Sequence, residues 1–377
     1  MAHTDNTEDA SLQLLPKITL HEALENGRYE EASMLIKGET EENLMKCYEN
    51  YDGYTPPSFK SYVHIIAGLT HEEQAVRLCR ELFSQITEAE NREKMLNATV
   101  VEEMRCGTKT IRARVAAIHI AAYTGNSGVV KLLEEYGVDV QCKTSETLDN
   151  KMTTGIMPLY WAAGSGRIEV VELLIASIGD VNASCSINGD TALHVACLCG
   201  QSDLVEWLMD NRANVDARRK KGDTPLYIAA KEGHREVANL LLDHEADVNA
   251  SLHINSATPL FIAAMNGHYD VVELLLNRRA DVNTSTHTKN VTPIFIAAYT
   301  GNDEVVRLLL DHNADVNTKR NTDGATPLYI AAQTGQYEVV KLLLDNNANP
   351  NERCHNGSRP INAAQSNNHS DIVELLQ

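Results

Sequence analysis

A phrase of seven residues recurs along this chain at a nearly constant spacing. Each copy opens on a threonine and reads T-[PA]-[LI]-[YFH]-[IV]-A-[AC], and consecutive copies are separated by 33, 34, 34 and 34 residues. A fixed period of this length indicates stacked supersecondary units, because a single unit of that size cannot cover its own apolar face. The opening threonines are Thr191, Thr224, Thr258, Thr292 and Thr326.

The residues of one copy predict where two helices begin and end. Thr224 is a favourable helix N-cap, and Pro225 suits the first helical position, where an amide hydrogen would have no partner. Gly233 predicts the end of this first helix, since glycine adopts the left-handed conformation without strain. Residues 235–244 then carry apolar side chains at helical spacing and predict a second helix. We therefore predict an all-α fold built from helix–turn–helix units, each followed by a projecting loop.

The repeated phrase resembles the signature of the ankyrin-repeat family, which is T-P-L-H-x-A at a period of about 33 residues. The resemblance implies an ankyrin-repeat solenoid, and the copies counted along the chain predict about 9–10 repeats. A degraded last copy, residues 358–376, has Asn367 and Asn368 where the others have glycine, and it predicts a polar terminal cap. Clear copies begin near residues 116, 157, 191, 224, 258, 292 and 326.

The strength of the repeat pattern divides the chain into three expected segments. Residues 1–15 are polar and acidic, and we expect them to be a disordered tail without the features of a signal peptide. Residues 16–115 predict atypical ankyrin-like repeats with an insertion, whereas residues 116–377 predict the regular array with its degraded C-terminal cap. Within the insertion, residues 84–112 break the period, and we expect a lengthened second helix followed by a loop of functional or merely connecting role.

Composition narrows the classes of partner. Acidic residues outnumber basic residues by 52 to 33, which gives a formal net charge of −19. This balance argues against nucleic-acid binding and against binding to an anionic membrane, because both need clustered cations. The cysteines are scattered, with no CxxC pair, which is typical of a reduced intracellular protein. We therefore expect a protein of the cytoplasm or the nucleus.

The sequence contains no pattern typical of an enzyme or of a bound cofactor. The motifs HExxH, GxSxG and GxxxxGK[ST] are absent. His194, Cys197 and Cys199 lie close together in sequence, but Cys197 occupies a core alanine position of the repeat, so the three side chains are not expected to converge on a metal. We predict no catalytic residue, no cofactor, no metal and no small-molecule substrate.

Positions that vary between otherwise similar repeats are the candidates for binding. In a solenoid the outward positions are the loop tips and the exposed side of each first helix, which we expect to line the concave face. A run of four basic residues, 218–221, stands out against the acidic total and suggests either a contact for an acidic partner or a solvated turn. The predicted partner-binding residues are Tyr123, Asp149, Leu198, Cys199, Arg218, Arg219, Lys220, Lys221, Lys231, His253, Met265, His287, Tyr299, Lys319, Arg320 and Gln333.

A longer loop interrupts the period between two early copies, at residues 141–157. In this loop Asp149 precedes Gly155 by six residues and Pro158 by nine, and residues 116–245 thereby resemble the feminization-protein (Fem) family. That family consists of ankyrin-repeat substrate receptors of cullin-type ubiquitin ligases that read C-terminal degrons, chiefly those ending in arginine. The resemblance implies that Asp149 grips a degron, whereas Cys199 stands where the family has a second acid. A turn-forming role for Asp149 is the alternative.

These observations lead to one principal hypothesis and three alternatives. The principal hypothesis is a noncatalytic scaffold or adaptor that binds a protein or peptide on the concave surface of the solenoid. The first alternative is the substrate-recognition part of a cullin-type ubiquitin ligase. The others are an enzyme hidden in residues 40–112 and a purely structural spacer.

Overall fold

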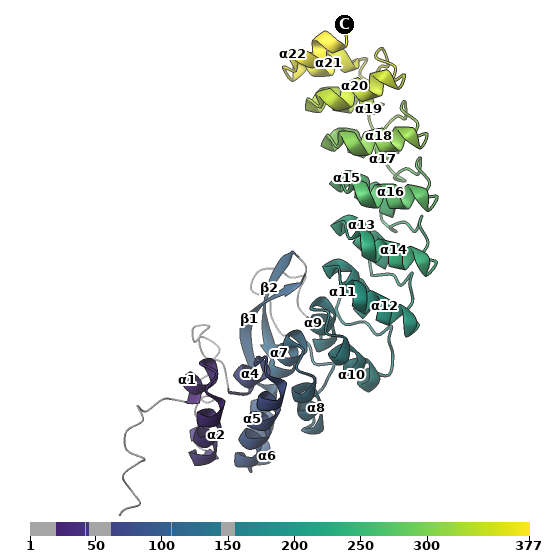
Figure 1. The fold of residues 1–377 in the computed structure, drawn as a ribbon. Helices are drawn as coiled ribbons and strands as arrows, with labels where there is room; N and C mark the ends of the chain where they lie inside the picture. Colours follow the sequence, from purple (N-terminus) through teal and green to yellow (C-terminus); the bar gives the residue numbers. More distant parts are fainter. Residues whose placement is uncertain (1–19, 42, 45–61, 107, 145–154) are drawn as a thin grey trace, which may run out of the picture. The chain divides into compact units, whose positions relative to one another are not determined.

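The computed structural model describes residues 20–41, 43–44, 62–106, 108–144 and 155–377. Within these ranges the chain forms ten helix pairs, a further helix and a two-stranded β-hairpin (Figure 1). The ten pairs confirm the predicted ankyrin-like solenoid of about 9–10 repeats. The expected disordered tail, residues 1–15, lies outside the described residues.

The chain divides into two compact units. The first comprises the residues up to Met104 together with Thr110–Ala162 and Glu169–Ile178, and the second comprises Arg105–Lys109, Ala163–Ile168 and Gly179–Gln377. The helix pairs of the second unit, from α11 onward, are called the regular array below. Their bounds are α11 Ala192–Cys199, α12 Ser202–Asp210, α13 Pro225–Glu232, α14 Arg235–Asp243, α15 Pro259–Asn266, α16 Tyr269–Asn277, α17 Pro293–Thr300, α18 Asp303–Asp311, α19 Pro327–Thr334, α20 Tyr337–Asp345, α21 Pro360–Ser366 and α22 Ser370–Leu375.

Local caps define the first helix of each full repeat in the regular array. In α13 the Thr224 hydroxyl accepts a hydrogen bond from the Tyr227 amide at 3.2 Å, and Pro225 occupies the first turn. Gly233 then ends the helix in the left-handed conformation, with φ +81°. Because the threonine and the glycine recur in every copy from α11 to α19, the same start and stop recur as the sequence predicts.

Neighbouring repeats of the regular array are joined by hydrogen bonds at two levels. At the start of most second helices a side chain lies within hydrogen-bonding distance of a carbonyl of the first helix in the preceding repeat, as where His268 Nε2 lies 2.9 Å from the Lys231 carbonyl oxygen. At the following turn, Asn249 Oδ1 accepts from the Asp281 amide at 3.0 Å, and Asn283 Oδ1 does so from the next repeat at 2.9 Å. These bonds fix the register of one repeat on the next, since each satisfies a backbone group at a helix end or turn.

The core of the array is mainly aliphatic, and each first helix adds two small residues to it and, in most repeats, one aromatic side chain. Ala229 and Ala230 of α13 are fully buried, which lets adjacent first helices approach closely. Tyr227 is also buried, and His194 takes its place in α11. Trp207 of α12 is half-buried. At the aromatic position, Tyr160, Tyr227, Phe261 and Phe295 are buried and Tyr329 is half-buried.

The first unit contains helices with less regular boundaries and the hairpin. Its core is aliphatic, with Leu24, Ile36, Ile66, Leu78 and Leu82 almost fully buried. Helices α9 and α10 have residues in both units. The bounds are α1 Leu20–Glu25, α2 Tyr29–Gly38, α4 Tyr62–Ala67, α5 Glu72–Gln85, α6 Ala89–Asn97, β1 Thr99–Cys106, β2 Lys109–Ala116, α7 Ala117–Thr124, α8 Ser127–Glu135, α9 Pro158–Gly164 and α10 Ile168–Ile178.

The expectation for residues 84–112 was wrong. Helix α5 ends at Gln85 instead of continuing, a separate helix α6 follows, and β1 pairs with β2 in a two-stranded sheet. The physical reason lies in the alternation of the strand residues: Met104 and Cys106 are buried while Arg105 between them is exposed. A period of two places these side chains on one face of a strand, which a helix would not do.

Candidate functional site

Five consecutive first helices of the regular array end on side chains that differ from repeat to repeat. These helices pack against one another in chain order, from α11 to α19 (Figure 1). The structure therefore brings most of the predicted first-helix residues into one row, which we call the helix-end row. Its members are Leu198, Cys199, Lys231, Met265, Tyr299 and Gln333.

The helix-end row is chemically mixed and open to solvent. Tyr299 has 49% of its surface exposed, although it directly follows two buried alanines of α17. Gln333 is exposed, whereas Lys231 and Met265 are half-buried. Lys231 also forms an ion pair with Glu232, with 2.8 Å between Nζ and Oε1. The aromatic ring of Tyr299 and the thioether of Met265 belong to residue types that are enriched in protein-binding surfaces.

The loops that follow the second helices form hairpins whose tips also make a row. Each hairpin is closed by a backbone hydrogen bond, such as that from Arg219 N–H to the Asp223 carbonyl at 3.0 Å. Neighbouring tips are also bonded to each other, for example from His287 N–H to the Asn255 carbonyl at 3.1 Å. The tips, named by their residues, are 186–189, 220–222, 253–256, 287–290, 321–324 and 355–357.

The structure separates the four basic residues 218–221 into two groups. Arg219 is bound by the buried carboxylate of Asp190 in the preceding hairpin, with 2.7 Å between Nε and Oδ1. Arg218 donates to the Ser251 carbonyl of the following hairpin at 2.9 Å. Both arginines therefore join repeats to each other, whereas Lys220 and Lys221 are exposed at the tip.

The remaining predicted tip residues differ in whether their side chains form ion pairs with neighbouring residues. His253 and His287 are exposed, and Lys319 pairs with Glu352 at 2.6 Å. Arg320 is held by Asp323 of its own hairpin, which raises the pKa of the guanidinium, and its Cζ lies 5.1 Å from the centre of the Phe295 ring. Arg320 therefore serves the packing of the hairpin on α17.

Two exposed isoleucines were missed by the sequence reasoning. Ile187 and Ile254 lie at hairpin tips with 39% and 67% of their surfaces exposed. An aligned comparison of the tips within the chain would have found them, because the other tips carry polar residues at the same place.

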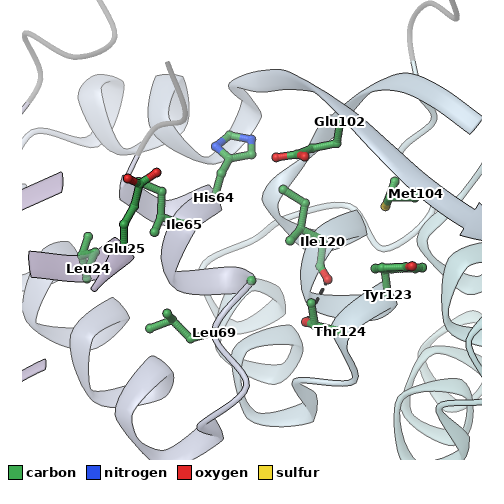
Figure 2. Close-up of a pocket in the computed structure, with 11 residues that line it drawn as sticks. Leu24, Glu25, His64, Ile65, Leu69, Glu102, Met104, Ile120, Tyr123 and Thr124 are labelled. Carbon is green, nitrogen blue, oxygen red and sulfur yellow. Dashed lines mark hydrogen bonds between the residues drawn. The ribbon is translucent and has the colours of Figure 1, made fainter. Parts of the chain in front are cut away.

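The predicted residue Tyr123 belongs to the first unit and lies in a pocket of about 330 Å³ (Figure 2). Its ring packs edge-on against the fully buried Trp161, with 6.3 Å between ring centres. The pocket was not predicted, since its residues come from α1, α4, the turn after α4, β1 and α7. Besides Tyr123, its lining consists of Leu24, Glu25, His64, Ile65, Gly68, Leu69, Glu102, Met104, Ile120 and Thr124.

Asp149, the predicted degron contact, lies outside the described residues. The described ends of its loop are joined: Gly155 N–H donates to the Thr144 carbonyl at 3.1 Å, and the Thr144 amide donates to the Ile156 carbonyl at 2.9 Å. His119 Nε2 also lies 3.2 Å from the Ile156 carbonyl oxygen. The loop is thus anchored at its base on α7.

The buried cysteine thiols and the buried histidine His194 lie in the core, where burial favours their uncharged forms. Burial raises the pKa of the Cys79 thiol to about 12 and that of Cys197 even further, so both are protonated at neutral pH. Burial lowers the pKa of His194 to about 4, and its ring nitrogens contact Thr191 and the Ala217 carbonyl. Among the described residues no cluster of three or more His, Cys, Asp and Glu side chains could hold a metal ion.

Comparison with known proteins identifies the family. A model of the ankyrin repeats in three copies matches overlapping segments that together span residues 89–377, more than half of the chain. This chain belongs to the ankyrin-repeat family. The proteins of this family are generally noncatalytic interaction modules. The matched segments are 89–185, 118–219, 159–251, 204–286, 260–354 and 318–377.

Individual ankyrin-repeat proteins match over shorter stretches. The ankyrin repeat and KH domain-containing protein mask-1 of Caenorhabditis elegans is 36% identical over 109 residues, which is 29% of this chain. The human ankyrin repeat and KH domain-containing protein 1 is 39% identical over 109 residues, again 29% of this chain. In both cases the match covers only 4% of the relative's length.

A solved ankyrin-repeat structure supports the same fold. The human ASB11 ankyrin repeat domain matches with a TM-score of 0.53 and 30% sequence identity, over 58% of this chain and 97% of that domain. In the part of the chain that the structure describes, no helix is long and apolar enough to cross a membrane.

Proposed function

We propose that this ankyrin-repeat protein is a noncatalytic scaffold that binds a protein or peptide along the helix-end row and the adjoining hairpin tips. The observation that carries the proposal is the contrast within each repeat. In α17, Ala297 and Ala298 are fully buried and are the same in the two neighbouring repeats, whereas Tyr299 beside them is 49% exposed and is replaced by a different residue in each of the other first helices from α11 to α19. Uniform supports with individual outward side chains are typical of repeat proteins that recognise one partner.

The proposal is tested by placing a photo-crosslinking amino acid at Tyr299 in the full chain. The matched control carries it at Arg307, which is exposed on the second helix α18 of the same repeat. After irradiation in a cell extract, we expect a discrete adduct at Tyr299 and none at Arg307. The adduct should disappear when Lys231→Glu is added, since that residue lies on the same row. Equal labelling at the two positions would refute the proposed surface.

The ubiquitin-ligase alternative stays a prediction, because Asp149 lies outside the described residues. Cys199 stands where the Fem family has a second acid, which counts against this alternative. Fluorescence polarisation with peptides that end in arginine measures it directly. Binding that is lost in Asp149→Ala would support a degron receptor, and peptides that bind both proteins alike would exclude it.

A further inference from the structure

Three neighbouring hairpins of the regular array expose an apolar, a basic and an apolar side chain in succession. Each hairpin opens on a residue whose backbone N–H donates a hydrogen bond to a carbonyl oxygen on the opposite side of the hairpin. These residues are Cys185, Arg219 and Leu252, and the N–O distances are 2.7, 3.0 and 3.0 Å. Two positions further along each hairpin stand Ile187, Lys221 and Ile254. The two isoleucines therefore occupy equivalent places on either side of the basic tip. We call Ile187, Lys220, Lys221 and Ile254 the tip patch.

The three tips form a continuous surface. The Lys220 amide donates to the Asn188 carbonyl of the preceding tip at 3.0 Å. On the other side, a Cβ on Gly222 would lie 2.8 Å from the His253 backbone nitrogen, so these two tips are in close contact. Neither gap leaves room for an intervening side chain. The tip patch is thus one surface with an apolar side chain at each end.

Charge is concentrated in the middle of the patch. Arg219 is neutralised by Asp190, whose side chain is only 4% exposed, whereas Lys220 and Lys221 are exposed and add two positive charges. This occurs in a chain of net charge −19, in which an exposed pair of cations is conspicuous. Exposed lysines attract a carboxylate partner and increase its rate of association.

We propose that the tip patch binds an acidic segment of a partner protein in an extended conformation, with apolar side chains on either side of its acidic residues. The inference rests on the proposed function and specifies the chemistry of the partner. The apolar side chains cover Ile187 and Ile254, and the carboxylates lie against Lys220 and Lys221.

The spacing of the repeats sets the spacing in the partner. Packed helices lie about 8–10 Å apart, so the two isoleucines, two repeats apart, are separated by roughly 16–20 Å. An extended chain rises about 3.3 Å per residue, and every second side chain points the same way. The partner should therefore carry its apolar residues about six positions apart, with Asp or Glu at the second and fourth positions between them.

The test is selection of random peptides of about twelve residues on the full chain, followed by measurement of Kd for the enriched peptides by fluorescence polarisation. The charge variant is Lys220→Glu with Lys221→Glu. Its matched control is Arg307→Glu with Lys341→Glu, which changes the net charge equally at two exposed positions on the second helices α18 and α20, outside the patch. The apolar variant is Ile254→Ser, whose folding is checked by circular dichroism.

We expect enriched peptides with the stated pattern, a Kd raised about tenfold or more by the charge variant and by Ile254→Ser, and little change in the control. Binding that the control weakens as much as the charge variant would overturn the inference. So would enrichment of acidic peptides without flanking apolar residues, since charge alone would then suffice. If these results are negative while Tyr299 still gives its specific adduct, the scaffold function stands and only the assigned partner chemistry fails.

Discussion

The first helices of the regular array are closed by the same residues in every full repeat, whereas the N-terminal helices are held by contacts that differ from helix to helix. From α11 to α19 a threonine hydroxyl begins each first helix and a left-handed glycine ends it. The N-terminal helices α2, α5 and α6 have no side-chain hydrogen bond at their N-caps, and each is followed by an extended residue.

Ion pairs and carboxylate hydrogen bonds take the place of caps in the N-terminal helices. Arg77 of α5 donates to both carboxylate oxygens of Glu30 on α2 at 2.8 Å and also pairs with Glu81. Glu41 accepts hydrogen bonds from the Thr87 hydroxyl at 2.7 Å and from Asn91 at 3.0 Å. A repeat can therefore lose its sequence signature and keep its helix pair, provided that other contacts hold the helix ends.

The largest expected effect is a loss of stability at low pH, caused by a buried histidine that each of the two regions contains. His119 in the first unit and His194 in the array occupy the same repeat position, and burial lowers the pKa of each to about 4, below the ordinary 6.5. The folded state therefore excludes a proton that the unfolded state binds, so stability is complete above pH 6.5 and is lost as the pH falls towards 4. For His119 we expect a loss of about 3 kcal/mol, measured by urea unfolding at several pH values.

The variant His119→Tyr, which copies Tyr160 at the same position, should flatten this dependence for helix α7, and His194→Tyr should do so for α11. Hydrogen exchange resolves the two helices. A pH dependence that is unchanged in both variants would show that the buried histidines do not cause it.

The second prediction concerns the capping glycines. Gly267 ends α15 with φ +74°, and an added Cβ would lie 2.8 Å from Asn302 Oδ1. We expect Gly267→Ala to cost about 2 kcal/mol, because a left-handed alanine is strained and its neighbour must move. Gly38, the last residue of α2, has open space around it. Gly38→Ala should therefore be neutral or should stabilise the protein by up to about 1 kcal/mol. Equal losses of unfolding free energy in the two variants would show that the left-handed conformation of Gly267 is not the cause.

The third prediction concerns the threonine caps. The Thr292 hydroxyl accepts from the Phe295 amide at 3.4 Å and lies 3.2 Å from the Thr318 hydroxyl. Thr292→Ala should lower the free energy of unfolding by about 1 kcal/mol, and Thr292→Ser should recover most of it because serine caps equally well. Thermal unfolding of the three proteins measures the effect. If serine were as destabilising as alanine, the lost methyl group and not the cap would be responsible.

The smallest expected effect belongs to the N-terminal helices alone. Hydrogen bonds from Asn91 and Thr87 lower the pKa of Glu41 to about 2, from an ordinary 4.5. A depressed carboxyl pKa means that this contribution to stability is present above pH 4.5 and is lost as the pH falls through 2. Glu41→Gln should reduce the acid sensitivity of hydrogen exchange in α6. The matched change Glu304→Gln, at an exposed position of α18, should leave α6 unaffected.

The regular array could be predicted in detail, because its signals are local. The caps of α13 depend on Thr224, Pro225 and Gly233, and these residues act within a few positions of themselves along the chain. Residues 84–112 could not be predicted in the same way. A β-hairpin is stabilised by pairing between two strands, and neither strand carries a cap or turn signal as strong as those of the array.

The proposed binding surface follows the sequence prediction in outline and differs from it in some of its members. Comparison of the repeats placed Lys231, Met265 and Tyr299 at equivalent helix ends, and the structure puts them in one row. The four basic residues 218–221 looked alike in sequence. In the structure, however, Arg219 forms an ion pair with Asp190, a residue 29 positions earlier. The exposed Ile254 was overlooked because a single apolar residue in a loop carries no periodic signal.

The amino-acid sequence by itself determined the family, the repeat length and the helix boundaries of the array, since caps, glycine stops and helical periodicity act between residues a few positions apart. Only the tertiary structure decided which charges and apolar side chains face outward. Residues about 30 positions apart are brought together when one repeat stacks on the next, and this stacking buries Asp190 against Arg219 while it leaves Lys220, Lys221 and Ile254 exposed.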